Sequence, residues 1–285
     1  MKRVPWAIRA GLRSLAGLFL AVTLADLSLA QATPCHSTPP GQGMAANVPW
    51  QDYLPRDRVR LHFIEQSTFV IGTRNVMAVA DFAGFISHDP DILPTVITMN
   101  SAHLTHKTDR PDPRIPHVLR GWSVDGIPAR HRLELPEMVI RNVTTDTLGT
   151  YDDQPPVMDG NSVLVFEAAG LCIGHFSHLQ TALSPAQQRA IGHLDVAIVP
   201  VDNGWAMEPV AMAAIAGGLG AKIIIPSHWF SETTLEVFLS DLSAEWEVVE
   251  IDQASVDLSP DTLPATPMVM VLRPGFLPCA SPARC

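Results

Sequence analysis

The chain has 285 residues, 47% of them hydrophobic, and carries a formal net charge of −10. This is the composition of an ordinary globular protein, and the length suffices for one substantial core. The acidic balance argues against a nucleic-acid partner and against an anionic membrane surface.

The first residues have the pattern of a cleaved export signal. A basic segment precedes an apolar run over residues 15–29, which ends in small residues. Cleavage after Ala30 or Ala32 fits the small-x-small rule, so residues 1–32 are predicted to be removed and the mature protein to be periplasmic, without a membrane anchor. The alternative is an uncleaved anchor, but the run is short for a membrane span and contains Asp26. The basic residues of the segment are Lys2, Arg3, Arg9 and Arg13.

Short strands are expected to dominate the first half of the mature chain. Runs of branched apolar residues alternate there with turn-forming stretches, which is the pattern of β-structure. The expected strands cover residues 58–64, 68–72, 76–80, 95–99, 117–122, 131–135, 138–143, 162–166 and 171–173.

Helices begin to alternate with strands near residue 184. Ser184, Pro185 and Gln187 form a helix start, with a capping serine, proline at the first helical position and a glutamine near the third. Strands at 196–201, 222–226 and 246–251 then alternate with helices at about 208–216 and 234–242. Such alternation implies parallel crossover units, in which ligand sites gather at the carboxyl ends of the strands.

These elements indicate an α/β (α+β) protein with a single folded unit. Residues 58–275 are expected to form that domain, preceded by an N-terminal extension at 33–57 and followed by a C-terminal tail at 276–285. The oligomeric state cannot be derived from these patterns.

Four cysteines are compatible with an oxidising compartment. A bridge from Cys279 to Cys35 or Cys285 is expected there, with the connectivity left open. Cys172 lies in an apolar strand and is expected to be a buried small hydrophobe. No CxxC pair is present, which argues against a four-cysteine zinc site.

Five histidines lie where the chain leaves three of the expected strands. Imidazoles delivered from separate strand ends can converge on one metal ion. If these side chains were spread over more than about 10 Å, Zn–N bonds of about 2.0–2.1 Å could not join them. The candidate metal ligands are His103, His106, His175, His178 and His228.

The order of these motifs resembles the metallo-β-lactamase superfold, within its branch of lactonase-like and uncharacterised zinc-dependent hydrolases. The similarity covers nearly all of the mature chain and is strongest in GLCIGHFSHLQTALSPAQQRAIGHLDVAIVPVDNGW and AKIIIPSHW. The resemblance implies an αββα sandwich with the metal site along one edge of the sheets.

The chain departs from the metal motif of that family. The family pattern HxHxDH corresponds to SAHLTH, in which Ser101 replaces a histidine and Thr105 replaces a metal-binding aspartate. Further along, His175 matches a family histidine, His178 stands where a bridging aspartate is expected, and His228 matches the last metal histidine. Gln66 and Asp81 stand near positions where the family carries a histidine and an aspartate.

Five imidazoles without an obvious bridging carboxylate favour one metal ion over two, because two close cations repel strongly. Zinc is the expected ion, although the same donors also suit other divalent transition metals. The leading hypothesis is an exported hydrolase of small-molecule esters, lactones or amides that uses metal-bound hydroxide. The alternative is a non-catalytic periplasmic protein that binds a metal or ligand, which the missing aspartate at Thr105 favours.

Other candidate site residues have less specific patterns. Asp202 and Asn203 follow an expected strand at its carboxyl end, so Asp202 is a candidate catalytic residue that orients a ligand, and Asn203 could bind substrate. A turn or helix-capping pair is an equally good interpretation of both. Arg120 could meet an anionic substrate group, although a structural ion pair is the commoner role of such an arginine.

Overall fold

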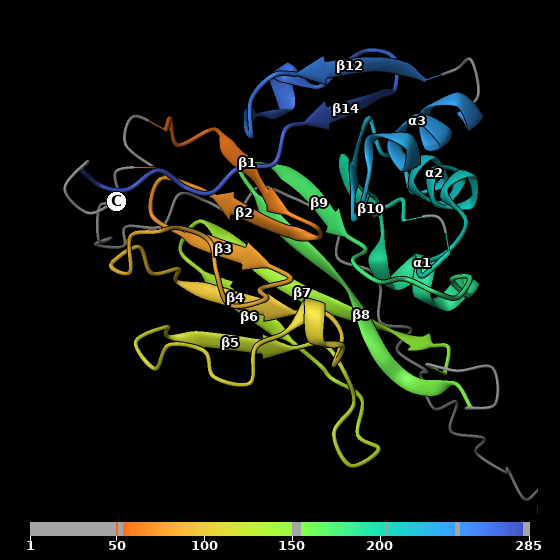
Figure 1. Cartoon of the computed structure of the whole chain (residues 1–285), viewed down its shortest axis with the longest axis horizontal. Coiled ribbons are helices and arrows are strands. Elements are labelled where there is room, and N and C mark those ends of the chain that lie inside the picture. Colours follow the sequence, from red (N-terminus) through yellow and green to blue (C-terminus); the bar gives the residue numbers. More distant parts are fainter. Residues whose placement is uncertain (1–49, 51–53, 150–154, 203, 243–245, 282–285) are drawn as a thin grey trace, which may run out of the picture. The chain divides into compact units, whose positions relative to one another are not determined.

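The strands form two mixed sheets that pack face to face (Figure 1). The computed structural model describes residues 50, 54–149, 155–202, 204–242 and 246–281. The first sheet has the order β13-β1-β2-β3-β4-β5, formed by β1 Val59–Glu65, β2 Thr68–Gly72, β3 Met77–Ala80, β4 Val96–Met99, β5 His117–Arg120 and β13 Ser255–Leu258. The second has the order β12-β14-β11-β10-β9-β8-β7-β6, formed by β6 Arg132–Leu135, β7 Met138–Thr147, β8 Val157–Ala168, β9 Leu171–His175, β10 Val196–Pro200, β11 Ile223–Ser227, β12 Glu247–Ile251 and β14 Met268–Leu272.

Alternating residues of the strands separate the core into two faces. In β10, Val196 and Ile198 belong to the cluster between the two sheets, whereas Ala197 and Val199 pack on the helical side of the second sheet. This period of two follows from the pleat, which directs successive side chains to opposite faces. Each fully buried branched side chain contributes about 1.5–3 kcal/mol, so burial on both faces makes the second sheet a stable platform.

Three helices cover the outer face of the second sheet. These are α1 Pro185–Ile191, α2 Pro209–Gly218 and α3 Glu232–Asp241, and Figure 1 shows them on one side of β10. The expected capping box is present, since the Ser184 side chain accepts from the Gln187 backbone N–H and the Gln187 side chain accepts from the Ser184 N–H. Connections of this kind make β9, β10, β11 and β14 parallel neighbours.

The outer face of the first sheet is covered differently. Loop residues Phe82, Ile86, Ile92 and Ile115 pack there, together with Leu277 near the C-terminus. The α/β sandwich expected from the resemblance is confirmed. Among the described residues, the three α-helices all pack on the second sheet, and loops cover the first. No helix in the described ranges is long and apolar enough to cross a membrane.

The hairpin of β7 and β8 is longer than the sequence patterns predict. Its apolar base was expected, but the ladder continues through polar residues to the pair Thr147 and Val157. Backbone hydrogen bonds hold this extension and do not require an apolar run. Strands β13 and β14 were not predicted; they return the chain to β1 and β11, so both sheets contain strands from the C-terminal part.

Cys172 is buried in β9, as expected, but the expectation that it stays outside a disulfide is wrong. This residue is disulfide-bonded, as is Cys279, so Cys172 is not a buried thiol. An apolar strand does not exclude a cystine, because a disulfide is itself an apolar group that packs well in a core. Cys35 and Cys285 lie outside the described residues, as do residues 1–32 of the expected signal.

A glycine allows the two sheets to approach closely near their shared edge. A Cβ added to Gly121 would lie 2.8 Å from the backbone oxygen of Asn100 and 2.9 Å from the Cβ of Ser162. Gly121 also donates its N–H to Met99 and accepts a hydrogen bond from the Ser162 hydroxyl. The Asn100 backbone and the Ser162 side chain therefore leave no room for a side chain at this position.

We expect Gly121→Ala to lower the free energy of unfolding by about 1–3 kcal/mol, since overpacking forces the backbone apart. Gly218→Ala is the matched control, because no atom lies within 4 Å of its added Cβ and alanine favours a helix. Chemical denaturation of both variants measures the effect. Equal stability of Gly121→Ala and wild type would contradict the close approach.

Candidate metal centre

Three buried histidines converge at the carboxyl ends of the strands. One ring nitrogen from each of His106, His178 and His228 lies within 4.8 Å of the others. His106 ends a short 3-10 turn, Leu104–His106, that follows β4, while His178 and His228 follow β9 and β11. Because β9, β10 and β11 are parallel neighbours, their carboxyl ends meet at one edge and bring together residues far apart in sequence.

Asp202 orients one of the three rings. Its Oδ2 lies 2.6 Å from Nδ1 of His228, and its Oδ1 accepts backbone hydrogen bonds from Gly204, Trp205 and Ala206. Burial by itself raises the pKa of Asp202, but the hydrogen bonds from His228 and the backbone outweigh it and lower the pKa. The carboxylate stays ionised and holds the Nδ1 proton of His228, which leaves Nε2 as the possible ligand atom.

Asp81 plays the same role for His106. It accepts a short hydrogen bond from Nδ1 of His106 and another from Oγ of Ser177 at 2.8 Å. Burial raises the pKa of Asp81, yet its contacts with His106, His175 and Ser177 outweigh burial and lower the pKa. Two of the three histidines are thus held by carboxylates, which fixes their tautomers and the orientation of their rings.

Two ring nitrogens in the cluster lack partners. His106 Nε2 and His178 Nδ1 are buried without a hydrogen-bond partner among the described residues. Burial, followed by the neighbouring His106 and His228, lowers the pKa of His178 to about 3, so its ring is neutral near pH 7. The centroids of these two rings lie 4.8 Å apart. Buried polar atoms are nearly always satisfied, so two unsatisfied nitrogens in neighbouring rings fit a bound ion.

A zinc ion fits this set with small adjustments. Zn–N bonds of about 2.0–2.1 Å place tetrahedral ligand atoms about 3.4 Å apart, so the rings must move inward by about 1 Å or less. Neutral imidazoles suit Zn²⁺ and also other divalent transition metals. The chemistry of the donors therefore matches a metal ion, and three histidine ligands would leave one tetrahedral position for water or substrate.

His103 lies beside the three histidines rather than among them. Its ring stacks on His178 with centroids 5.6 Å apart and planes 12° apart, and its Nδ1 lies 2.9 Å from the Thr105 hydroxyl. Burial and the neighbouring His106 and His228 lower its pKa. The side chain is nevertheless exposed, so it flanks the open side of the cluster.

His175 does not take part in the cluster, contrary to its expected role as a ligand. Its Nε2 donates to the carbonyl oxygen of Ser67 at 2.8 Å, and its Nδ1 lies 3.3 Å from the amide nitrogen of Asn100. Both ring nitrogens are used, and burial lowers the pKa of the ring. The last residue of β9 points between the sheets, whereas the turn after it carries His178 to the site.

Strained backbone gathers around the histidines. Asp81, Ser177, His228 and Gln66 all have positive φ, between 47° and 56°. The Gln66 carbonyl accepts the His228 N–H at 2.7 Å, so the β1–β2 turn fixes the loop that bears His228. Residues other than glycine rarely adopt this conformation, and such strain clusters at functional sites.

The remaining expected residues have varied positions. Ser101 is buried beside the loop, where its Oγ accepts the His103 N–H at 3.4 Å, while Thr105 is exposed. Arg120 is exposed at the end of β5 and does not line the pocket next to the histidines. Asn203 lies outside the described residues.

Sequence patterns missed the supporting roles of Asp81, Ser177 and Asn100. The resemblance placed Asp81 near a family aspartate without giving it a task. Ser177 and Asn100 are single polar residues next to strand ends, and such residues usually terminate strands or form turns. A stronger signal was the polar residue directly after each buried strand, at the edge where parallel strands place ligands.

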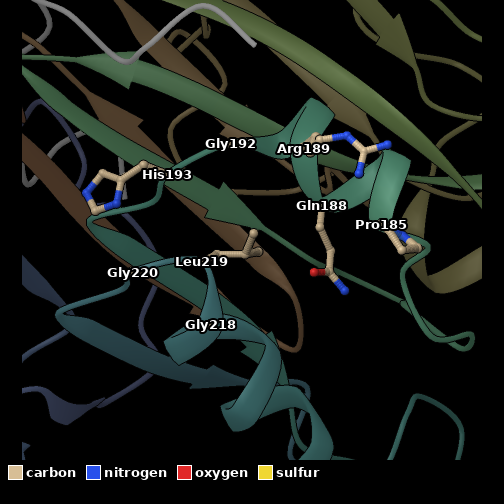
Figure 2. Close-up of a pocket in the computed structure, with 8 residues that line it drawn as sticks. All are labelled: Pro185, Gln188, Arg189, Gly192, His193, Gly218, Leu219 and Gly220. Atoms are coloured by element: carbon tan, nitrogen blue, oxygen red, sulfur yellow. The ribbon is translucent and has the colours of Figure 1, made fainter. Parts of the chain in front are cut away.

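A pocket of about 550 Å³ adjoins the cluster, with His103 and His178 in its wall. A separate hollow of about 470 Å³ lies between α1 and the end of α2, surrounded by Gln188, Arg189 and His193 (Figure 2). The second hollow shares no lining residue with the first and contains none of the three histidines. Of these two hollows, the first is therefore the one that adjoins the histidines.

Comparisons with known proteins agree with this architecture. Residues 60–228 match the sequence profile of the beta-lactamase superfamily domain. A Thermotoga maritima protein of the metallo-beta-lactamase superfamily, whose zinc-dependent hydrolase activity is itself inferred, has 24% identity and a TM-score of 0.53 over 75% of this chain and 100% of its own. A Veillonella parvula protein, inferred to be a metal-dependent hydrolase, has 13% identity and a TM-score of 0.50 over 70% and 98%. No curated protein sequence matches the chain.

We expect His178→Gln to lose most of its bound metal, because it removes one of three convergent ligands. His175→Gln should keep the wild-type metal content, since its ring nitrogens already bond to Asn100 and Ser67. Elemental analysis of proteins loaded with zinc and then desalted measures metal per chain. Loss of metal in His175→Gln with retention in His178→Gln would assign the ligands the other way.

Proposed function

Because the chain belongs to the beta-lactamase superfamily, we propose that it is an exported metal-dependent hydrolase of small-molecule esters, lactones or amides. The observation that carries the proposal is the cluster of His106, His178 and His228, in which two rings are held by carboxylates and two ring nitrogens lack partners. Such an arrangement is typical of a catalytic three-histidine site with an open position.

We propose one zinc ion in this site. Two close cations need carboxylate bridges to offset their repulsion. Asp81 and Asp202, the carboxylates nearest the histidines among the described residues, already bond to His106 and His228. A zinc ion bound here supplies Lewis acidity, which polarises a carbonyl group and makes water a better nucleophile near neutral pH.

The side chains of the chain itself hold and orient the reacting groups. Asp81 and Asp202 keep the Nδ1 protons of His106 and His228 and so direct both Nε2 atoms inward. His103 stands exposed on the open side, where its ring can hydrogen-bond the substrate carbonyl or the leaving group. Hydrolysis adds one water across the bond: its oxygen joins the acyl carbon, and the leaving group departs with a proton.

The second candidate is a non-catalytic protein that binds a metal or a ligand on the same fold. The observation in its favour is that Thr105 replaces the motif aspartate, while both neighbouring carboxylates are occupied by histidines. The described residues beside the histidines therefore offer no carboxylate that is free to act as a general base. His103 is the nearest alternative base, since its ring is exposed and its pKa is below the ordinary value.

Turnover separates the two candidates. We expect the zinc-loaded protein to hydrolyse at least one member of a panel of uncharged esters, lactones and amides, and a chelator to abolish this activity until zinc is restored. His106→Gln should lower kcat/KM by at least about a hundredfold, because it removes a ligand of the metal that activates the reaction. The exposed His193→Gln serves as the control and should retain activity. Bound zinc without turnover on any substrate would favour the binding protein.

The proposal of export rests on the N-terminal sequence and on cystine chemistry. Residues 1–32 have the pattern of a signal peptide, and Cys172 and Cys279 are disulfide-bonded, as is common in oxidising compartments. We expect the mature protein to begin at Gln31 or Thr33 after expression in a bacterium. Intact-mass spectrometry of the periplasmic fraction measures this, and an unprocessed chain that stays in the cytoplasm would refute export.

A further inference from the structure

The pocket next to the histidines has a largely apolar wall. Large hydrophobic side chains from four separate segments of the chain enclose its volume of about 550 Å³. These side chains are Leu104, Trp122, Leu148, Val157 and Trp205. A cavity of this size suits a small molecule with a ring or a medium-length acyl chain.

Four of these side chains are far more exposed to solvent than residues of the hydrophobic core. Leu104 is 79% exposed, Trp205 63%, Leu148 54% and Val157 52%. Single exposed hydrophobic residues are common, but several gathered around one pocket mark a surface that binds a ligand. Their position beside His103 and His178 places such a ligand next to the candidate metal centre.

Polar residues of the wall bond mainly to the protein. Gln180 accepts the Leu148 N–H through Oε1 and donates to the Trp205 carbonyl through Nε2, which also lies 3.1 Å from His178 Nε2. Ser123 donates to the carbonyl of Met158. Gln180 thereby joins two apolar walls to the cluster, and most of its amide hydrogen-bonding capacity is used within the protein.

The described lining contains no lysine, arginine, aspartate or glutamate. A carboxylate or phosphate on a substrate would have to leave water without gaining an ionic partner, at a high cost in free energy. The net charge of −10 adds repulsion against anions. Both effects disfavour charged substrates and favour apolar ones.

We propose that this pocket binds the apolar acyl or aryl group of an uncharged ester or lactone, with the scissile carbonyl at the end formed by His103 and His178. The inference rests on the proposed hydrolase function and narrows its substrate class. Trp205 and Leu148 are the specificity-determining residues of the pocket, since they form its exposed walls and bond through their backbones to Gln180.

Hydrolysis of matched esters by the zinc-loaded protein tests the substrate class. We expect kcat/KM for p-nitrophenyl hexanoate to exceed that for p-nitrophenyl acetate by at least about tenfold, because additional methylene groups become buried. The p-nitrophenyl half-ester of adipic acid, which has the same chain length and a terminal carboxylate, should react at least about tenfold more slowly than the hexanoate. Preference for acetate or for the half-ester would overturn the inference while the hydrolase function stands.

Binding of an uncharged fluorescent probe, 6-propionyl-2-(dimethylamino)naphthalene, tests the pocket without any turnover. Trp205→Ala should weaken probe binding by at least about tenfold, since it removes the largest exposed wall of the pocket. Phe276→Ala, which removes an exposed aromatic ring outside the pocket, should bind the probe as wild type does. Equal binding by wild type and Trp205→Ala would place the probe elsewhere and refute the pocket.

Ester hydrolysis and probe binding together distinguish a failure of the hydrolase proposal from a failure of the proposed substrate class. If the probe binds in the pocket but no ester is hydrolysed, the hydrolase proposal fails and the apolar pocket stands. If esters are hydrolysed without preference for the apolar chain, the function stands and the substrate class is wrong. Circular dichroism of Trp205→Ala verifies that the variant is folded before either result is interpreted.

Discussion

One buried carboxylate, Asp81, connects the two sheets at the edge where the histidines meet. It accepts hydrogen bonds from His106 in the loop after β4, from Ser177 after β9 and from the backbone N–H of Asn100. A fully buried charge is costly unless it is paired, and these three donors provide the pairing. Separating the two sheets at this edge would break these hydrogen bonds and leave the carboxylate without its partners. The position of His106 relative to His178 and His228 therefore depends on Asp81.

On the opposite side of the site, the carboxylate of Asp202 has a corresponding role. Asp202 uses one oxygen for His228 and the other for three backbone N–H groups of the following turn. That turn carries Trp205, so the same carboxylate that orients a histidine also positions a wall of the apolar pocket. One residue thus links the histidine cluster to the pocket, and the loop after β10 contributes to both.

Much of the secondary structure and most of the candidate site could be predicted from the sequence, because both depend on patterns of neighbouring residues. Runs of branched residues identify the strands, and the Ser-Pro-x-Gln pattern places the start of α1. Four of the five candidate histidines lie at the site, since each belongs to a segment that follows a strand end. His175 was misassigned because a residue at the very end of a strand and one three positions later look alike in sequence, while the chain turns sharply between them at Ser177, with φ of 47°.

By itself, the sequence determined which residue types stand at the ends of which strands, because hydrophobic periodicity and turn chemistry act over a few residues. It also determined that the motif lacks its aspartate at Thr105. Only the tertiary structure decided that Asp81 and Asp202 each hold a histidine, that His175 is occupied by Asn100 and Ser67, and that an apolar pocket lies beside the cluster. These contacts join segments up to about a hundred residues apart, and their geometry depends on sheet pairing and strained turns rather than on any local pattern.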